Sequence, residues 1–328
     1  MAGPTAVGKS ALALKLAERL GGEIISVDSM QVYRGLDIGT AKPSAEEQAH
    51  VPHHLIDVAE PHETFDASRF LNLALAAEAD ILRRGRVPIF CGGTGLYFKA
   101  LLEGLEPGVG ADPVFRESLE ALDNHQLSAR LRELDPVAYE RIDRSNRRRL
   151  VRALEVIHLT GRPFSEQRRD WSAEPEEQPL ALNPSHVGLD RERDDLYTRI
   201  NERVDAMFAR GLVEETQLLM GRGLSQNATA MQAIGYRQVV EHLEGKRSLH
   251  ETVEAVKTAT RRFAKRQLTW FRNQMNLRWF QLTDATTGRE ERESRPARPS
   301  KVSLQQLVNE LTADWSPFLP EQKRNHGN

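Results

Sequence analysis

Residues 1–100 show two patterns of apolar and polar positions, one typical of helices and one typical of strands. Leucines spaced four residues apart over 12–20 indicate a helix that ends at Gly21-Gly22, and a second amphipathic helix is expected over 67–84. Short apolar runs typical of buried strands lie at 23–27, 54–58 and 87–91. This order predicts an α/β fold, a parallel sheet flanked by helices, with ligands bound beyond the carboxyl ends of the strands.

Beyond residue 111 the pattern changes. Residues 112–184 resemble arginine-rich helices without a strand signal, and strand character returns only at 186–189. We therefore predict that a helical insertion interrupts the α/β core. The predicted segments are a first part of the core at 1–111, the insertion at 112–184, a second and mainly helical part of the core at 185–282, and a partly disordered linker and C-terminal extension at 283–328.

A complete phosphate-loop motif, GPTAVGKS, occupies residues 3–10. In such a loop the backbone N–H groups surround phosphate oxygens, the lysine adds a positive charge, and the serine hydroxyl ligates Mg²⁺ at a helix N-terminus. The motif predicts a phosphate-loop, nucleotide-kinase-like fold that holds a diphosphate or triphosphate. Its candidate ligands are Gly3, Pro4, Thr5, Ala6, Val7, Gly8, Lys9 and Ser10, with Ser10 as the metal ligand.

Only Met1 and Ala2 precede this loop, whereas a phosphate loop normally follows a central, apolar strand. We expect that strand to lie in the middle of the sheet, paired on both edges. The natural polypeptide is therefore expected to begin about ten residues upstream, with a strand rich in Val, Ile and Leu.

The composition narrows the class of protein. The 328 residues carry a net charge of −2 and contain no apolar run of the roughly 18 residues that cross a membrane. The N-terminus also lacks a basic flank followed by an apolar stretch of the secretory type. A single cysteine, Cys91, excludes an internal disulfide and a multi-cysteine zinc site, and we expect it to be buried. These features predict a cytoplasmic protein without a membrane partner.

Two basic segments are hidden by the near-neutral total charge. Residues 141–152 contain six arginines and one acid, Asp143, and residues 255–278 contain seven basic residues and no acid. The second segment also carries Phe263, Trp270 and Phe271, which could stack on bases. Either segment alone would be read as a solvated helix face, but the two together favour nucleic acid as a partner.

Asp28 ends the strand that follows the phosphate-loop helix, so its carboxylate should point across the mouth of the site. A carboxylate there can take a proton from an attacking group as the bond to the donor forms. The alternative is a strand-end aspartate that only caps a turn. Asp57 has a weaker case, because it could equally orient a turn or help to hold magnesium through water.

Six motifs together closely resemble the bacterial tRNA dimethylallyltransferases, also called tRNA isopentenyltransferases. The resemblance covers about residues 1–280, with the motifs in the family's order and spacing. The motifs are GPTAVGKS at 3–10, DSMQVYRGLDIGTAKP at 28–43, PHHLID at 52–57, GGTGLY at 92–97, GYRQ at 235–238 and KRQLTWFR at 265–272.

The resemblance implies transfer of a dimethylallyl group from dimethylallyl diphosphate to the exocyclic N6 of adenosine 37, beside the anticodon, in tRNAs that read codons beginning with U. Diphosphate is the leaving group, so Lys9, Ser10 and Mg²⁺ would stabilise its developing charge. Asp28 would serve as the base for N6. The adenine must be flipped out of the anticodon loop to reach the site. Arg193 matches a family arginine and is a further candidate for diphosphate binding, although a surface salt bridge fits it as well.

By the same resemblance, the helical insertion is a tRNA-binding domain, and the partner is the anticodon stem-loop of tRNA, bound by a monomer. The implied tRNA contacts are Asp28, Ser29, Met30, Gln31, Thr94, Arg116, Arg148, Arg149, Leu150, Val151, Arg152, Gln232, Ala233, Ile234, Gly235, Tyr236, Arg237, Lys265, Arg266, Gln267, Leu268, Thr269, Trp270, Phe271 and Arg272.

Two other classes of protein compete with this interpretation. An ATP-dependent small-molecule kinase would explain the phosphate loop and Asp28 but would leave the basic segments without a role. A nucleic-acid-dependent ATPase would use the basic segments, yet no strand ends in the hydrophobic run and acid of a Walker B motif.

Overall fold

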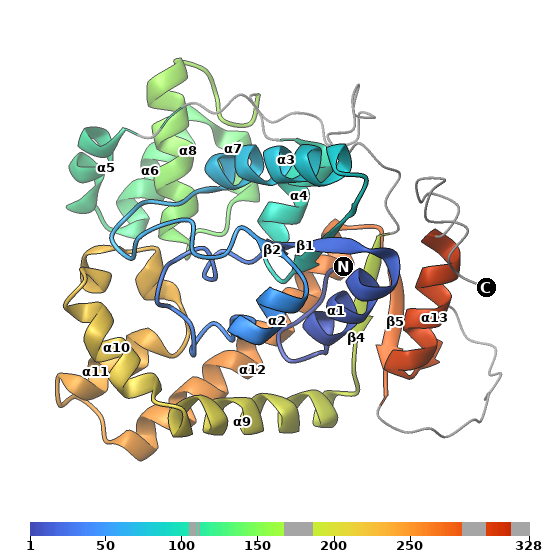
Figure 1. Ribbon diagram of the computed structural model, residues 1–328. Coiled ribbons are helices and arrows are strands. Elements are labelled where there is room, and N and C mark those ends of the chain that lie inside the picture. The colour runs from blue at the N-terminus through green and yellow to red at the C-terminus, as the bar shows by residue number, and fades with distance from the viewer. Residues whose placement is uncertain (105–109, 111, 167–185, 284–299, 316–328) are drawn as a thin grey trace. The chain divides into compact units, whose positions relative to one another are not determined.

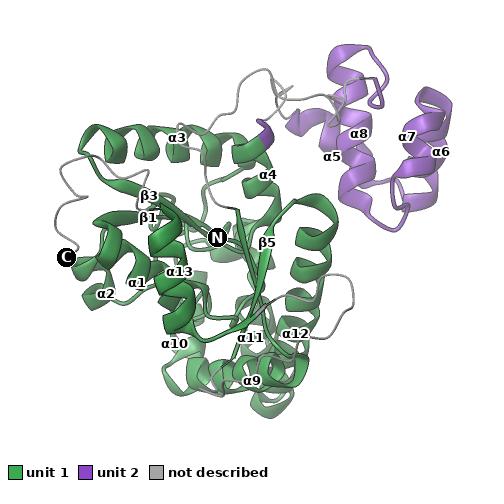
Figure 2. Cartoon of the chain, turned by 90° about the vertical axis from the view of Figure 1, so that its right-hand side faces the viewer, with its two compact units in different colours: residues 1–102, 180–328 green, residues 103–179 purple. Residues whose placement is uncertain are grey.

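The computed structural model describes residues 1–104, 110, 112–166, 186–283 and 300–315. They form two compact units, each considered by itself: unit 1, residues 1–102 with 180–328, and unit 2, residues 103–179 (Figure 2). Unit 2 begins nine residues before the expected start of the insertion at 112 and ends five residues before its expected end at 184. The expected end of the insertion, most of the linker at 283–301 and the tail beyond 315 lie outside the described residues.

The elements of unit 1 alternate between strand and helix in its first part (Figure 1). The first part contains α1 (Lys9–Leu20), β1 (Gly22–Val27), α2 (Ala45–His50), β2 (His53–His54), α3 (Ala67–Arg83), β3 (Val87–Gly92) and α4 (Gly95–Glu103). The second part contains β4 (Val187–Asp190), α9 (Arg193–Ala209), α10 (Leu212–Met220), α11 (Tyr236–Leu243), α12 (Leu249–Gln274), β5 (Arg278–Leu282), β6 (Ser300–Val302) and α13 (Leu304–Trp315).

The strands pair in parallel throughout, as predicted. Two three-stranded sets have the orders β2-β1-β3 and β4-β5-β6. Ala2 joins them, because it forms parallel bridges to Gly92 of β3 and to Gly188 of β4. Its N–H donates to the Val187 carbonyl at 2.8 Å, and its own carbonyl accepts from Leu189 at 2.9 Å. Met1 and Ala2 thus lie at the centre of the sheet, where the strand before the phosphate loop was expected.

The sheet is covered on both faces because side chains alternate along each strand. Ile24 of β1 packs on one side with the leucines of α1 and with Leu307 and Leu311 of α13. Ile25, its neighbour, packs on the other side with Phe70 of α3 and with Tyr97 and Phe98 of α4. Burial on both faces explains why β1 resembles a continuous apolar run rather than an alternating one.

Three parts of unit 1 differ from the sequence prediction. The strand expected over 54–58 contains only His53 and His54, because Leu55 and Asp57 adopt left-handed backbone angles, with φ of 61° and 57°, that end the strand. Strands β5 and β6 were not predicted. The segment assigned to a linker and extension contributes β6, which pairs with β5; α13, by contrast, matches the helix that the sequence predicts over 302–313, and it packs on α1.

Unit 2, as far as it is described, consists of helices α5 (Pro113–Glu120), α6 (Asn124–Leu134), α7 (Pro136–Arg141) and α8 (Arg147–Thr160). Their apolar faces enclose a small core of leucines. Glu155 is fully buried among them and accepts hydrogen bonds from Arg116 at 2.7 and 2.8 Å and from Arg152 at 2.7 Å. Burial alone would raise the pKa of Glu155, but these hydrogen bonds outweigh it and lower the pKa.

Among the described helices, none combines the length and the apolar composition needed to span a bilayer.

Candidate active site

The phosphate loop lies at the carboxyl edge of the sheet and leads directly into α1. Its path requires left-handed backbone at Ala6, with φ of 63°, and at Gly8, with φ of 111°. At Gly3 the loop passes close to β4, where an added Cβ would lie 2.7 Å from the Leu189 carbonyl oxygen. The glycines of the motif therefore serve both the turn and the close approach of backbone to backbone.

Lys9 folds over the loop that precedes it. Its Nζ donates to the carbonyl of Gly3 at 3.0 Å and to that of Pro4 at 2.6 Å. The pKa of Lys9 is lowered to about 8, chiefly by burial; the electrostatic effects of Cys91 and Asp28 oppose the shift, and the positive charge of Arg203 adds to it. The ammonium is thus destabilised in the absence of an anion, and a bound diphosphate would restore its charge.

Three side chains from the second half of unit 1 hold the loop. The Arg191 Nε donates to the Val7 carbonyl at 2.9 Å. The Gln267 Oε1 accepts from the Thr5 N–H at 2.9 Å, and the Arg203 Nη1 lies 3.4 Å from the Thr5 hydroxyl.

The family resemblance offered Arg193 as a further diphosphate ligand, and the sequence analysis named neither Arg191 nor Arg203. Arg193 is exposed at the start of α9, with its guanidinium 5.2 Å from the centre of the Tyr197 ring, and it makes no described contact with the loop. Arg191 could have been found, because it follows the carboxyl end of β4 directly, at the sheet edge that carries the phosphate loop.

Asp28 sits where β1 ends and begins the turn 28–31. Its Oδ1 accepts from the N–H groups of Met30 at 2.8 Å and Gln31 at 3.3 Å, so the capping alternative describes part of its role. The neighbouring Ser29 N–H donates to the Thr94 hydroxyl at 3.0 Å, which ties this turn to the end of β3. A carboxylate has two oxygens, so capping through one leaves the proton-accepting role open.

Residues 31–43 follow this turn and are called the wall below. The Gln31 Oε1 accepts a hydrogen bond from the Ser26 hydroxyl at 2.9 Å, and its Nε2 donates to the Thr40 carbonyl at 3.2 Å. Lys42, only 4 % exposed, pairs with Asp57 at 2.5 Å and donates to the Tyr33 carbonyl at 2.6 Å. Asp57 therefore stabilises this wall, as the orienting alternative required.

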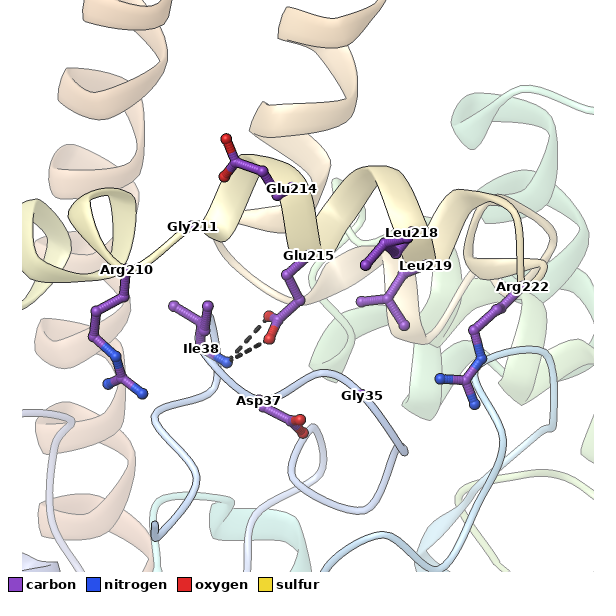
Figure 3. A pocket seen from close by; sticks show the side chains of 10 residues that line it. All are labelled: Gly35, Asp37, Ile38, Arg210, Gly211, Glu214, Glu215, Leu218, Leu219 and Arg222. Atoms are coloured by element: carbon purple, nitrogen blue, oxygen red, sulfur yellow. Dashed lines mark hydrogen bonds between the residues drawn. The ribbon is translucent and has the colours of Figure 1, made fainter. Parts of the chain in front are cut away.

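Glu215 of α10 fixes the same wall from outside (Figure 3). Its carboxylate accepts from the Ile38 N–H at 3.0 and 3.1 Å and from the Tyr236 hydroxyl at 2.6 Å. The adjoining pocket of about 520 Å³ in Figure 3 is lined by residues of this wall, of α10 and of the segments that flank α10. None of them belongs to the phosphate loop, so we assign no substrate to the pocket.

The implied tRNA contacts divide into exposed and buried residues. In α12, Lys265, Arg266, Thr269 and Arg272 are exposed, whereas Gln267 and Phe271 are buried. Arg272 also forms an ion pair with Asp190 at 2.5 Å. Trp270 packs so closely on Gly95 that a Cβ there would lie 2.2 Å from the ring.

The same division holds elsewhere. Ala233, Gly235 and Tyr236 are buried while Gln232 and Arg237 are exposed, with Ile234 between. In unit 2, Arg148 and Arg149 are exposed, Val151 is half-buried and Leu150 is buried. Arg116 and Arg152 bind Glu155. The buried side chains cannot touch tRNA in this conformation, so they support the surface instead.

A magnesium ion fits the donor set around the phosphate loop. The described residues contain no cluster of three or more His, Cys, Asp or Glu side chains that could hold a metal by itself. Magnesium bound with a diphosphate needs few protein oxygens, because phosphate oxygens and water complete its shell. The exposed hydroxyl of Ser10 at the start of α1 is such an oxygen, and Asp28 supplies negative charge close enough to act on Lys9.

The phosphate loop, its surrounding cations and the facing acidic turn define a phosphate-loop enzyme of the parallel α/β class. The sequence model of the IPP transferase family matches residues 31–274. The chain is 46 % identical over 285 residues to a tRNA dimethylallyltransferase of Anoxybacillus flavithermus, covering 87 % of this chain and 90 % of the relative. The corresponding enzyme of Geobacillus kaustophilus is 48 % identical over 288 residues, covering 86 % and 90 %.

Solved structures agree. The full-length tRNA isopentenylpyrophosphate transferase of Bacillus halodurans superposes with a TM-score of 0.67 at 40 % identity, covering 98 % of this chain and 96 % of that one. A eukaryotic dimethylallyltransferase, solved while acting on tRNA, superposes with a TM-score of 0.69 at 29 % identity, covering 85 % and 72 %. The chain belongs to the IPP transferase family of tRNA dimethylallyltransferases.

Proposed function

We propose that this enzyme transfers the dimethylallyl group of dimethylallyl diphosphate to N6 of adenosine 37 in tRNAs that read codons beginning with U. The observation that carries the proposal is the phosphate loop facing Asp28 at one edge of the sheet, in a chain whose relatives bear the name tRNA dimethylallyltransferase. Because tRNA is the acceptor, we place the reaction in the cytoplasm, and we expect a monomer.

Asp28 acts on the acceptor. The N6 lone pair is delocalised into the adenine ring, so the amine is a poor nucleophile and gains from a base. As the bond from N6 to the allylic carbon forms and the bond from that carbon to the diphosphate oxygen breaks, the N6 proton passes to the Asp28 carboxylate. Thr94 and Gln31 keep the turn that carries Asp28 in place.

The phosphate loop acts on the leaving group. Its N–H groups, with Lys9, would stabilise the charge that develops on the diphosphate. Arg203 lies against Thr5 and is the further cation we assign to the diphosphate, in place of Arg193. A magnesium ion held by Ser10 and the diphosphate would supply additional positive charge at the leaving oxygens.

The exposed cations bind the tRNA backbone. Arg148 and Arg149 offer positive charge on unit 2, and Lys265 and Arg266 offer it on α12 of unit 1. Contacts of this kind fix position and make affinity depend on salt. The target adenine must leave the stack to reach the site, and we assign Ser29 to Gln31 to its edge.

One mixing experiment tests the proposal against its competitors. Purified enzyme is incubated with Mg²⁺, labelled dimethylallyl diphosphate and unmodified tRNA, and in parallel with ATP, with and without RNA. The expected result is label on adenosine 37 and release of diphosphate. ATP turnover without prenylation would instead indicate a kinase or a nucleic-acid-dependent ATPase, which the comparisons do not favour.

A further inference from the structure

Gln267 connects the two loops that form the active site. Its side chain is 7 % exposed and uses both ends of the carboxamide. The Oε1 accepts from the Thr5 N–H of the phosphate loop at 2.9 Å, and the Nε2 donates to the Gly93 carbonyl at 2.9 Å. One side chain of α12 is therefore hydrogen-bonded to the diphosphate loop and to the segment that follows β3.

The two loops carry opposite halves of the reaction. Thr5 belongs to the loop assigned to the leaving group. Gly93 precedes Thr94, whose hydroxyl accepts from Ser29 beside the proposed base Asp28. A change in the separation of Thr5 and Gly93 would therefore change the distance between the allylic carbon and the adenine N6.

The Gln267 carboxamide occupies the space that a side chain on Gly93 would need. A Cβ on Gly93 would lie 2.3 Å from the Gln267 Nε2, so the absence of a side chain admits the carboxamide. One turn further along α12, Trp270 fills the space over Gly95 in the same way. The inner face of α12 therefore packs against residues 93–95 through Gln267 and Trp270. Lys265 and Arg266, on the same turn of the helix as Gln267, are exposed.

We propose that Gln267 is a positioning residue that sets the separation of the two substrate loops, and not a contact for tRNA. The proposal rests on the function proposed above. The family resemblance places Gln267 within a tRNA-binding stretch, yet the side chain is buried and each end of its carboxamide is already bonded to another loop of the protein.

The test compares Gln267→Leu with Gln274→Leu. Leucine is close to glutamine in size but makes neither hydrogen bond, and Gln274 is an exposed glutamine at the end of the same helix. Each variant is given saturating dimethylallyl diphosphate and unmodified tRNA, and the rate of a single turnover is measured. The affinity for tRNA and the melting temperature are measured on the same preparations.

We expect Gln267→Leu to lower the single-turnover rate by about 10- to 100-fold, because a misplacement of about 1 Å between reacting groups has an effect of this size. Its tRNA affinity should stay within about threefold of the wild type, as for Gln274→Leu. A weaker tRNA affinity with an unchanged rate at saturation would overturn the proposal in favour of a tRNA contact. A lower melting temperature with an unchanged rate would reduce Gln267 to a purely structural residue.

Gln267→Glu provides a second variant if the leucine variant fails to fold. Glutamate still accepts from the Thr5 N–H but cannot donate to the Gly93 carbonyl when ionised, so the rate should again fall while tRNA affinity changes little. An unchanged rate in this variant would refute the proposal. Failure of the proposed function is a separate result, since wild type and Gln274→Leu would then both leave the tRNA unmodified.

Discussion

Binding of dimethylallyl diphosphate should weaken with rising pH, and Lys9 is the cause. The pKa of Lys9 is lowered to about 8 by burial against the loop carbonyls, from an ordinary value of 10.5. Below pH 8 the lysine is charged with and without ligand, so affinity is constant. Above pH 8 Lys9 is mostly neutral in the free enzyme, whereas a bound diphosphate favours the charged ammonium. Binding must therefore be accompanied by the uptake of one proton. Affinity should therefore fall about tenfold per pH unit, and be about tenfold below its plateau at pH 9.

The assay is calorimetric titration of the enzyme with dimethylallyl diphosphate and Mg²⁺ from about pH 7 to pH 9.5. The terminal phosphate loses its last proton near pH 6, so the ligand charge is constant over most of this range. Lys9→Arg is the matched control, because arginine stays charged and its curve should be flat even if its affinity is lower. A flat curve for the wild type, or an equal decline in Lys9→Arg, would refute the reasoning.

The same shift in pKa has a consequence for stability. The unfolded chain holds the Lys9 proton up to about pH 10.5, whereas the folded protein releases it near 8. Between these values the unfolded state binds more protons, so this group makes folding more favourable as pH rises, and its full penalty applies below pH 8. Lys9→Met removes the penalty and should stabilise the protein at pH 7 by up to about 3 kcal/mol while it abolishes diphosphate binding. Chemical denaturation measures the gain, and a Lys9→Met variant less stable than the wild type would contradict it.

Three further substitutions probe separate parts of the molecule. Asp28→Asn should lower the turnover number by about 10²- to 10⁴-fold with little change in tRNA affinity, because the amide oxygen can still cap the turn but cannot take a proton; an equal loss of affinity would mark a binding residue. Gly95→Ala should cost about 1 to 3 kcal/mol of stability through its clash with Trp270, seen as a lower melting temperature, and Trp270→Ala in the same chain should recover part of it. Lys265→Ala should reduce the slope of log tRNA affinity against log salt by about 0.7 to 0.9, and an unchanged slope would make this residue a solvated surface cation.

The parallel fold and the location of the phosphate loop and Asp28 were predictable from the sequence. Both predictions depend on patterns within a few residues of each other. A glycine-rich loop before a helix indicates a phosphate site, and an acid at the end of a parallel strand lies at the edge of the sheet where ligands bind. The apolar run of β1 is also clear, because this strand is buried on both faces, while β3 begins with alternating buried and half-buried residues. The comparisons with known proteins confirmed the family and the α/β class.

Other features depend on which residues meet across the fold, and a single sequence does not contain that information. The helical spacing of Phe263, Gln267 and Trp270 predicts that Gln267 lies on the inner face of its helix, but it does not predict which two loops this side chain bonds. Arg116 carries the same charge as Arg149, yet a buried glutamate from another helix binds only the first. The length of the strand predicted at 54–58 was too great, because its apolar residues belong to a loop. Leucine rarely adopts a left-handed backbone angle, so the sequence did not indicate the turn at Leu55.

The pairing of α1 with α13 has a consequence for how the chain is made. The helix that follows the phosphate loop leaves the ribosome well before α13, because Asn309, which accepts a hydrogen bond from Arg19 of that helix, follows it 290 residues later. At about 5 to 20 residues per second, the apolar side of α1 waits roughly 15 to 60 seconds for its final cover. The edge of β5 lacks β6 for a much shorter time, because β5 precedes β6 by only about 20 residues. Unit 1, which carries the phosphate loop, is therefore completed only after residues 300–315 have been synthesised. Substitutions in residues 300–315 should reduce the yield of folded enzyme more than the turnover rate of each folded molecule.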